Sequence, residues 1–242
     1  AWNIVSIDDS YYHVDCTWDD PVVDRFGMVS HEHFLVSDAV FQSERNHFGW
    51  DLTELVCENT KYDDYYWVGV DSQIILENDF SYFISDSNIV RRNLKDNTEE
   101  TIKNLGLWYV WDSYSYWVGA FSGLFMQEDA LYYNTSTEIR KIATDGTNDT
   151  VVYQPDISEG YVYGIKKQGT ELKYVIKQEP MVSGQIFTAD VVLDNVNSSF
   201  DSLTDIAEGQ WYYEAVEYVY HHNYMTGITE TLFGPNEKLD RA

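Results

Sequence analysis

The sequence predicts a mainly β protein, in which residues 1–55 form part of a small mixed α+β core and residues 56–242 form a module of β repeats. Two observations lead to this prediction. After about residue 55 helical periodicity disappears, and pairs of tyrosines recur before the turn-forming residues Gly, Asn and Asp. The same region contains an internal repeat, which is typical of folds built by packing small β units together.

The first element that the alternation of side chains predicts is a strand over residues 11–17. On this strand His13 and Asp15 lie on one face, while Val14 and Cys16 lie on the other. We expect the polar face to line a cleft and the other face to pack inward. Cys16 is then most simply a small buried hydrophobic residue.

A second short strand is predicted over residues 34–36, whose sequence is Phe-Leu-Val. Ser37 or Asp38 follows it directly, and both residue types cap turns and helix starts through their side-chain oxygens. We therefore expect a buried strand that leads into a capped turn.

Two strings in this first segment resemble the last part of a transglutaminase-like (papain-type) catalytic core. They are AWNIVSIDDSYYHVDCTWDDP, residues 1–21, and VSHEHFLVSDAVFQSERNHFGWD, residues 29–51. In that family the catalytic His directly precedes an Ala-Trp-Asn strand, and the next strand carries an Asp in a Val-Asp-x-Thr setting, which is Asp15 here. The resemblance implies that Asp15 orients the imidazole, and that the nucleophilic Cys and the His lie upstream of Ala1.

The cysteines and histidines within the chain do not replace that missing pair. Cys16 points away from Asp15 on a strand, and a thiol needs a neighbouring base to act as a nucleophile. His13 shares a face with Asp15, so a contact between them is possible, but a structural role is the preferred interpretation. His31, His33 and His47 suggest zinc, yet no further ligand completes the set at a characteristic spacing. We therefore predict no metal site and, in the absence of a phosphate-binding glycine loop, no cofactor.

The internal repeat aligns residues 80–102 with residues 130–152 at an offset of 50. Tyr82 matches Tyr132, and Ile89 matches Ile139. Each copy reads as an aromatic strand, a polar turn, a strand with Ile or Val, a turn and a third strand. Looser copies occur at residues 160–176 and 210–233.

A three-stranded unit of this size cannot bury one face alone, so neighbouring copies are expected to stack or to be arranged radially. The pattern resembles the degenerate propeller-like repeats that follow bacterial transglutaminase-like cores. A small propeller and an irregular or incomplete one both remain open.

The densest aromatic cluster is a candidate binding surface, consisting of Trp108, Trp111, Tyr114, Tyr116 and Trp117. Exposed aromatic rings provide platforms for sugars and peptides. The other explanation is that these rings fill the core between β units. Because they fall on both parities of a strand, they cannot all face one core, and both explanations stay open.

The chain is strongly acidic, with 41 acidic and 15 basic residues and a net charge of −26. Such a charge repels phosphate backbones and anionic lipids, so we predict neither nucleic-acid binding nor membrane insertion, and no apolar run is long enough to span a bilayer. Cys16 and Cys57 allow one disulfide at most and do not indicate a compartment. The family resemblance instead implies a secreted or cell-surface bacterial protein.

Two functions are therefore expected. The resemblance implies that the parent is a secreted cysteine acyl-transfer enzyme, a peptidase or transglutaminase acting on protein or cell-wall peptide, and that this chain alone is inactive. The alternative is a non-catalytic extracellular binding or adhesion module, whose aromatic β repeats recognise a surface partner such as a glycan.

Overall fold

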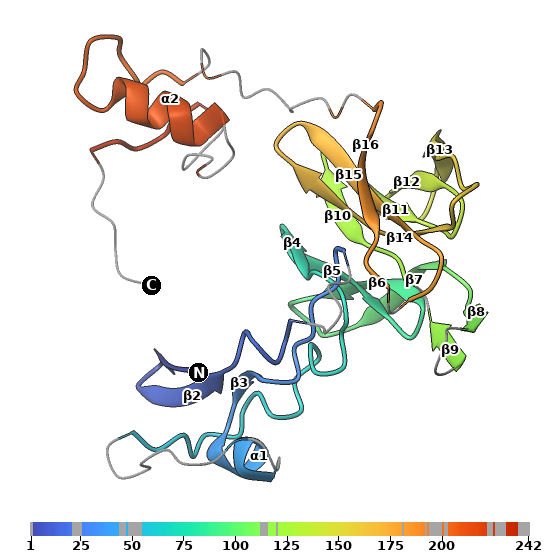
Figure 1. The fold of residues 1–242 in the computed structure, drawn as a ribbon. Helices are drawn as coiled ribbons and strands as arrows, with labels where there is room; N and C mark the ends of the chain where they lie inside the picture. Colours follow the sequence, from blue (N-terminus) through green and yellow to red (C-terminus); the bar gives the residue numbers. More distant parts are fainter. Residues whose placement is uncertain are drawn as a thin grey trace. The chain divides into compact units, whose positions relative to one another are not determined.

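A computed structural model describes residues 2–20, 26–43, 47, 55–111, 116–119, 121–180, 182–191, 193, 200, 203–221, 225 and 231–236. The chain divides into two compact units. The first unit contains residues 1–166 and 172–191, and the second contains residues 167–171 and 192–242. Most of the regular secondary structure in the described residues is antiparallel β-strand (Figure 1), which confirms the predicted fold class at that level.

The N-terminal sheet has the strand order β1-β2-β3, formed by β1 (Asn3–Ile7), β2 (Ser10–Val14) and β3 (Phe34–Val36). Asp8 and Asp9 join β1 to β2 with φ values of 50° and 61°. Two successive left-handed residues match the twist of a tight hairpin, and Asp tolerates this conformation well. A short helix, α1 (Asp38–Ser43), follows β3 directly, as the capping residues predict.

The internal repeat corresponds to two four-stranded antiparallel meanders, each with its strands in chain order. The first consists of β4 (Ile75–Glu77), β5 (Phe80–Ser85), β6 (Asn88–Asn93) and β7 (Glu99–Asn104). The second consists of β10 (Leu124–Gln127), β11 (Ala130–Asn134), β12 (Ile139–Ala143) and β13 (Thr150–Tyr153). Each copy therefore has one strand more than the sequence pattern predicts.

The two meanders share one hydrophobic core. Tyr82 and Ile89 of the first meander pack in the same buried cluster as Leu131, Tyr133 and Ile142 of the second. Neither meander buries its apolar face by itself, which agrees with the expectation that neighbouring copies must pack together.

Two smaller sheets complete the strands of this region. One is three-stranded, with β14 (Tyr161–Gln168), β15 (Glu171–Lys177) and β16 (Gln185–Ala189), and the other pairs β8 (Trp108–Trp111) with β9 (Tyr116–Gly119). No sheet closes into a barrel among the strands that the structure describes.

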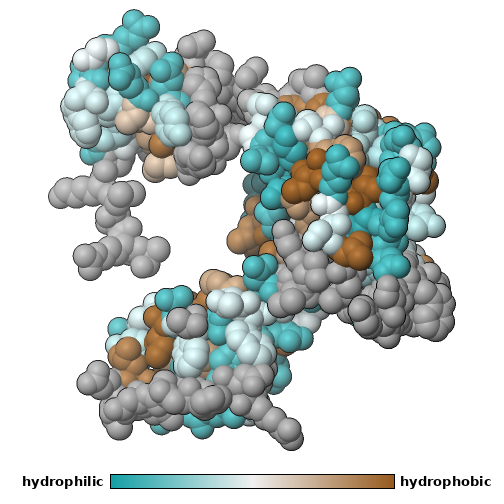
Figure 2. Space-filling model, in the orientation of Figure 1, coloured by the Kyte–Doolittle hydropathy of each residue, from teal (hydrophilic) through white to brown (hydrophobic). Residues whose placement is uncertain are grey.

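Figure 2 shows apolar side chains exposed on the first unit between stretches of hydrophilic ones. Leu76, Leu107 and Ile186 are the most exposed large aliphatic residues described in the first unit.

Three glycines permit a close approach of backbones from distant parts of the first unit. A Cβ atom added at Gly164 would lie 1.7 Å from the carbonyl oxygen of Phe26, and one at Gly123 would lie 2.2 Å from the carbonyl oxygen of Ile165. Gly27 meets the same Ile165 oxygen at 2.4 Å. The segment around Phe26, which lies between β2 and β3, is therefore held directly against the backbone of β14.

In the second unit the described residues form one helix, α2 (Tyr213–His221). The prediction of a β-repeat copy over residues 210–233 is wrong for this stretch. Residues 213, 216 and 220 recur at the helical period, and their side chains meet on one side of the helix. They contribute to an apolar cluster whose members are Phe200, Leu203, Val216, Ile206, Tyr212, Tyr213, Tyr220 and Phe233.

Candidate functional site

Asp15, the predicted catalytic carboxylate, lies at the end of β2 and is only 1% exposed. Its Oδ1 atom accepts hydrogen bonds from the backbone N–H groups of Thr17 at 3.0 Å and Trp18 at 3.2 Å. Its Oδ2 atom lies 3.1 Å from Nε2 of His47. The carboxylate therefore contacts a histidine within this chain, a pairing that the sequence reasoning missed.

These contacts keep the Asp15 carboxylate ionised. Burial by itself raises the pKa of a carboxyl group, because it removes water from the charged form. Hydrogen bonds from His47 and from the N–H groups of Trp18 and Thr17 oppose this effect and hold the pKa of Asp15 below its ordinary value. Asp15 is thus an anion suited to orient an imidazole.

Two further histidines also pair with aspartates in this region. Nδ1 of His33 lies 3.0 Å from Oδ1 of Asp19, and Nε2 of His13 lies 2.7 Å from Oδ1 of Asp38. Burial raises the pKa of Asp19 above its ordinary value and outweighs the hydrogen bonds from His33. His13 thus pairs with Asp38, 25 residues away, and not with Asp15, which strand alternation had suggested as a possible partner.

The ring of Phe41 lies in the middle of these pairs. It stacks on His13 with a centroid distance of 4.3 Å and an interplanar angle of 2°, and its centroid lies 3.9 Å from that of His47. Trp2 meets its edge at 5.2 Å. One fully buried aromatic residue of α1 thus holds two of the His–Asp pairs in place.

The structure corrects the prediction that Cys16 is buried. Strand β2 ends at Val14, and the chain then turns through backbone hydrogen bonds from Trp18 and Asp19 to the Asp15 carbonyl. The alternation of faces therefore stops before Cys16, which is exposed, whereas Cys57 is buried. Both cysteines are free.

Neither thiol has the surroundings of a nucleophile. Burial and the nearby Asp38 carboxylate raise the pKa of Cys57 to about 11, so this group is a protonated thiol at neutral pH. Cys16 is exposed, and no hydrogen bond with a histidine is found for it among the described residues.

Two of the suspected zinc histidines are neighbours, since the ring centroids of His33 and His47 lie 5.2 Å apart, but the three histidines contact different partners. His31 contacts the carbonyl oxygen of Val70 at 2.9 Å, His33 contacts Asp19, and His47 contacts Asp15. His31 and His33 lie in the turn before β3 and not on a strand, so their side chains do not share one strand face.

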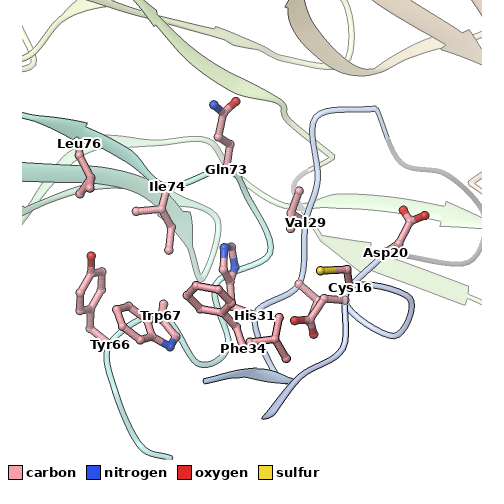
Figure 3. Close-up of a pocket in the computed structure, with 13 residues that line it drawn as sticks. Cys16, Asp20, Val29, His31, Phe34, Tyr66, Trp67, Gln73, Ile74 and Leu76 are labelled. Carbon is pink, nitrogen blue, oxygen red and sulfur yellow. The ribbon is translucent and has the colours of Figure 1, made fainter. Parts of the chain in front are cut away.

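An open pocket of about 680 Å³ lies beside β2 and β3. Phe34, Tyr66 and Trp67 line it together with Ile74 and Leu76, and the rings of Phe34 and Trp67 meet at a centroid distance of 5.5 Å. Figure 3 shows these rings on one side of the pocket, with the Cys16 and Asp20 side chains across from them.

The chemistry of this pocket suits a ligand with an apolar or ring-shaped part and a polar or cationic group. The aromatic and aliphatic walls provide contact area, while the exposed carboxylate of Asp20 and the imidazole of His31 provide the polar edge. Sequence reasoning missed this site, although the aromatic run Tyr65-Tyr66-Trp67 was a signal that could have indicated it.

The predicted aromatic surface is described only in part. Trp108 is half-buried and packs against Phe121 at 5.3 Å and Tyr163 at 5.4 Å. Its ring thus contacts a core cluster. Tyr114 and the side chains of Trp111, Tyr116 and Trp117 lie outside the described residues.

The most exposed large aromatic residue that the structure describes is in the second unit. Trp211 is 87% exposed and stands in the turn before α2, with its ring 5.6 Å from that of Tyr212. A bare indole of this kind offers a stacking surface to a ligand.

Comparison with known proteins identifies one segment. Residues 202–242 match the S-layer homology domain, and this segment lies within the second unit. No curated protein matches the chain. The S-layer homology domain is characteristic of extracellular proteins at the cell surface, and this is the location of the chain. Among the described residues, no helix has the length and apolar character needed to cross a bilayer.

Proposed function

We propose that this chain is a non-catalytic binding protein of the cell surface. Its S-layer homology segment attaches it to the cell wall, and its β-rich first unit binds a partner. The observation that carries this proposal is the match at residues 202–242, which falls in a separate compact unit with an apolar cluster of its own.

Attachment to a wall glycan is supported by the exposed surface of the second unit. S-layer homology domains bind glycans or polymers of the cell wall. Trp211 presents an indole that is 87% exposed, and such a ring stacks on the apolar face of a sugar.

Partner binding is supported by the pocket beside β2 and β3. Its aromatic walls contain Phe34 and Trp67, and Asp20 stands at its edge. Together with the net charge of −26, this arrangement favours a peptide segment that carries an apolar residue next to a Lys or Arg.

The attachment is tested by replacing Trp211 with Ala in the whole chain. We expect a loss of affinity for purified cell walls of at least about fivefold in a sedimentation assay, since stacked aromatic contacts commonly contribute about 1–3 kcal/mol. The matched control is Tyr161→Ala, which removes an exposed aromatic residue, 45% accessible, from β14.

The control variant should sediment with walls as the unmodified chain does. If the unmodified chain does not bind purified walls, or if Trp211→Ala and Tyr161→Ala bind equally well, wall attachment through this surface is disproved.

A second candidate function is the acyl-transfer enzyme implied by the transglutaminase-like resemblance. It is favoured by the contact between the ionised Asp15 carboxylate and the His47 imidazole. In this reading residues 1–55 belong to a transglutaminase-like core, and the four-stranded meanders are propeller-like blades that follow it.

This candidate is tested with Asp15→Asn in the whole protein. The substitution keeps the shape of the side chain but removes the charge that orients an imidazole, so turnover of an amide substrate should fall by orders of magnitude while the fold persists. Turnover that stays near the unmodified level, or a whole protein without thiol-dependent amidase activity, would exclude this role for Asp15.

A further inference from the structure

The side chains of His13, Asp38 and Cys57, each with a different donor atom, meet beside the N-terminal sheet. His13 comes from β2, Asp38 is the first residue of α1, and Cys57 lies in the segment that follows residue 54. Their donor atoms all lie within 4.8 Å of one another. The pocket and the Asp15–His47 pair use none of these three side chains.

The geometry of this cluster is fixed by its own hydrogen bonds. The backbone N–H of Asp38 donates to the Cys57 carbonyl at 2.8 Å, and the backbone N–H of Cys57 donates to Oδ2 of Asp38 at 3.0 Å. The remaining carboxylate oxygen, Oδ1, faces Nε2 of His13 at 2.7 Å. The His13 ring is in turn held by stacking on Phe41. Such outer contacts orient metal ligands in established sites.

The burial of the cluster suits a metal with an open position. His13 and Cys57 are fully buried, whereas the Asp38 side chain is 14% exposed. Two donors are thus shielded from water, and the third leaves a path for an ion and for one water molecule. Three protein ligands and a water complete a tetrahedral zinc site.

The donor set also selects the metal. Imidazole nitrogen and thiolate sulfur are good zinc ligands, whereas Ca²⁺ and Mg²⁺ prefer oxygen donors alone. Zinc bonds of about 2.0–2.3 Å are compatible with this cluster after movements of about 1 Å, because the donors already lie close together.

We propose that His13, Asp38 and Cys57 form a three-ligand site for Zn²⁺, with water as the fourth ligand. On binding, a zinc–sulfur bond replaces the Cys57 S–H bond, and the thiol proton passes to water. A zinc–nitrogen bond replaces the Nε2–H bond of His13, whose ring takes the tautomer with its proton on Nδ1, and Oδ1 of Asp38 turns from Nε2 to the metal. The ion would tie β2, α1 and the segment around Cys57 together. This site is independent of the proposed attachment to the cell wall.

Cobalt(II) titration of the metal-free whole chain tests the site. We expect one equivalent to bind and to produce the near-ultraviolet charge-transfer band of a thiolate ligand, and we expect Zn²⁺ to displace it. Cys57→Ser should lose this band. Cys16→Ser, which removes the exposed cysteine, should keep it and is the matched control.

Thermal unfolding gives a second measurement. Excess Zn²⁺ should raise the Tm of the unmodified chain and of Cys16→Ser by about 5–10 °C, but not that of Cys57→Ser. If Cys57→Ser fails to fold, Asp38→Asn takes its place and should bind cobalt at least about tenfold more weakly. The absence of a thiolate band in the unmodified chain, or a band that survives in Cys57→Ser, overturns the proposal. So does cobalt binding by a folded Asp38→Asn variant that is as tight as in the unmodified chain.

Discussion

Replacing Phe41 by Ala is expected to lower the free energy of unfolding of the first unit by about 3–5 kcal/mol. The Phe41 side chain has no exposed surface. Its ring contacts Trp2, His13 and His47 at centroid distances of 5.2, 4.3 and 3.9 Å. Truncation would remove this apolar surface from the core and leave a cavity beside two His–Asp pairs.

Urea unfolding followed by tryptophan fluorescence measures this loss, because Trp2 and Trp18 both lie against His47. The control is Leu107→Ala, a truncation at a position that is 50% exposed, which should change the stability by less than about 1 kcal/mol. A Phe41→Ala variant that loses no more than this control would show that the ring does not hold the region together.

The second large effect is expected from Gly164→Ala, which should cost about 3 kcal/mol or more, or prevent folding of the first unit. Gly164 has a φ of +98°, and an added Cβ would lie 1.7 Å from the Phe26 carbonyl oxygen. The backbone of β14 or of the Phe26 segment would have to move, because a carbonyl oxygen cannot rotate away like the end of a side chain.

Gly106→Ala separates the clash from the backbone conformation. Gly106 has a similar positive φ of +73°, but nothing lies within 4 Å of its added Cβ. We expect a cost of about 1 kcal/mol there, from the left-handed conformation alone. Equal losses for the two variants in thermal and urea unfolding would contradict the close backbone contact at Gly164.

The β character and the repeat could be predicted because they depend on local signals. Aromatic and β-branched residues followed by turn residues specify hairpins over a few positions. The matching positions Tyr82 and Tyr132 accordingly lie in equivalent strands, β5 and β11. The additional strand at the start of each meander, β4 or β10, was missed because these strands are short, with three and four residues.

The pairing within the candidate site could not be predicted, because its partners are distant in the sequence. His47 lies 32 residues from Asp15, and His13 lies 25 residues from Asp38. Alternation along a strand suggested His13 as a neighbour of Asp15, but tertiary packing on α1 turns its ring to Asp38. Local periodicity carries no information about such contacts.

Helix α2 was missed for a different reason. The sequence from Trp211 to Tyr220 is rich in aromatic residues, which favour strands when considered one by one. The spacing of Tyr213, Val216 and Tyr220 follows the helical period instead, and burial of that face in the apolar cluster decides the conformation.

The shared core of the two meanders has a consequence for the order of events as the chain is made. Ile142 is its last contributor along the sequence, so the cluster that buries Tyr82 and Ile89 is complete only when that residue has emerged. Before the second meander has been made, the strands of the first meander can pair with one another but have no complete apolar partner. An isolated sheet of this kind is only marginally stable. The stability of the first meander therefore depends on sequence that is made later, up to and including β12.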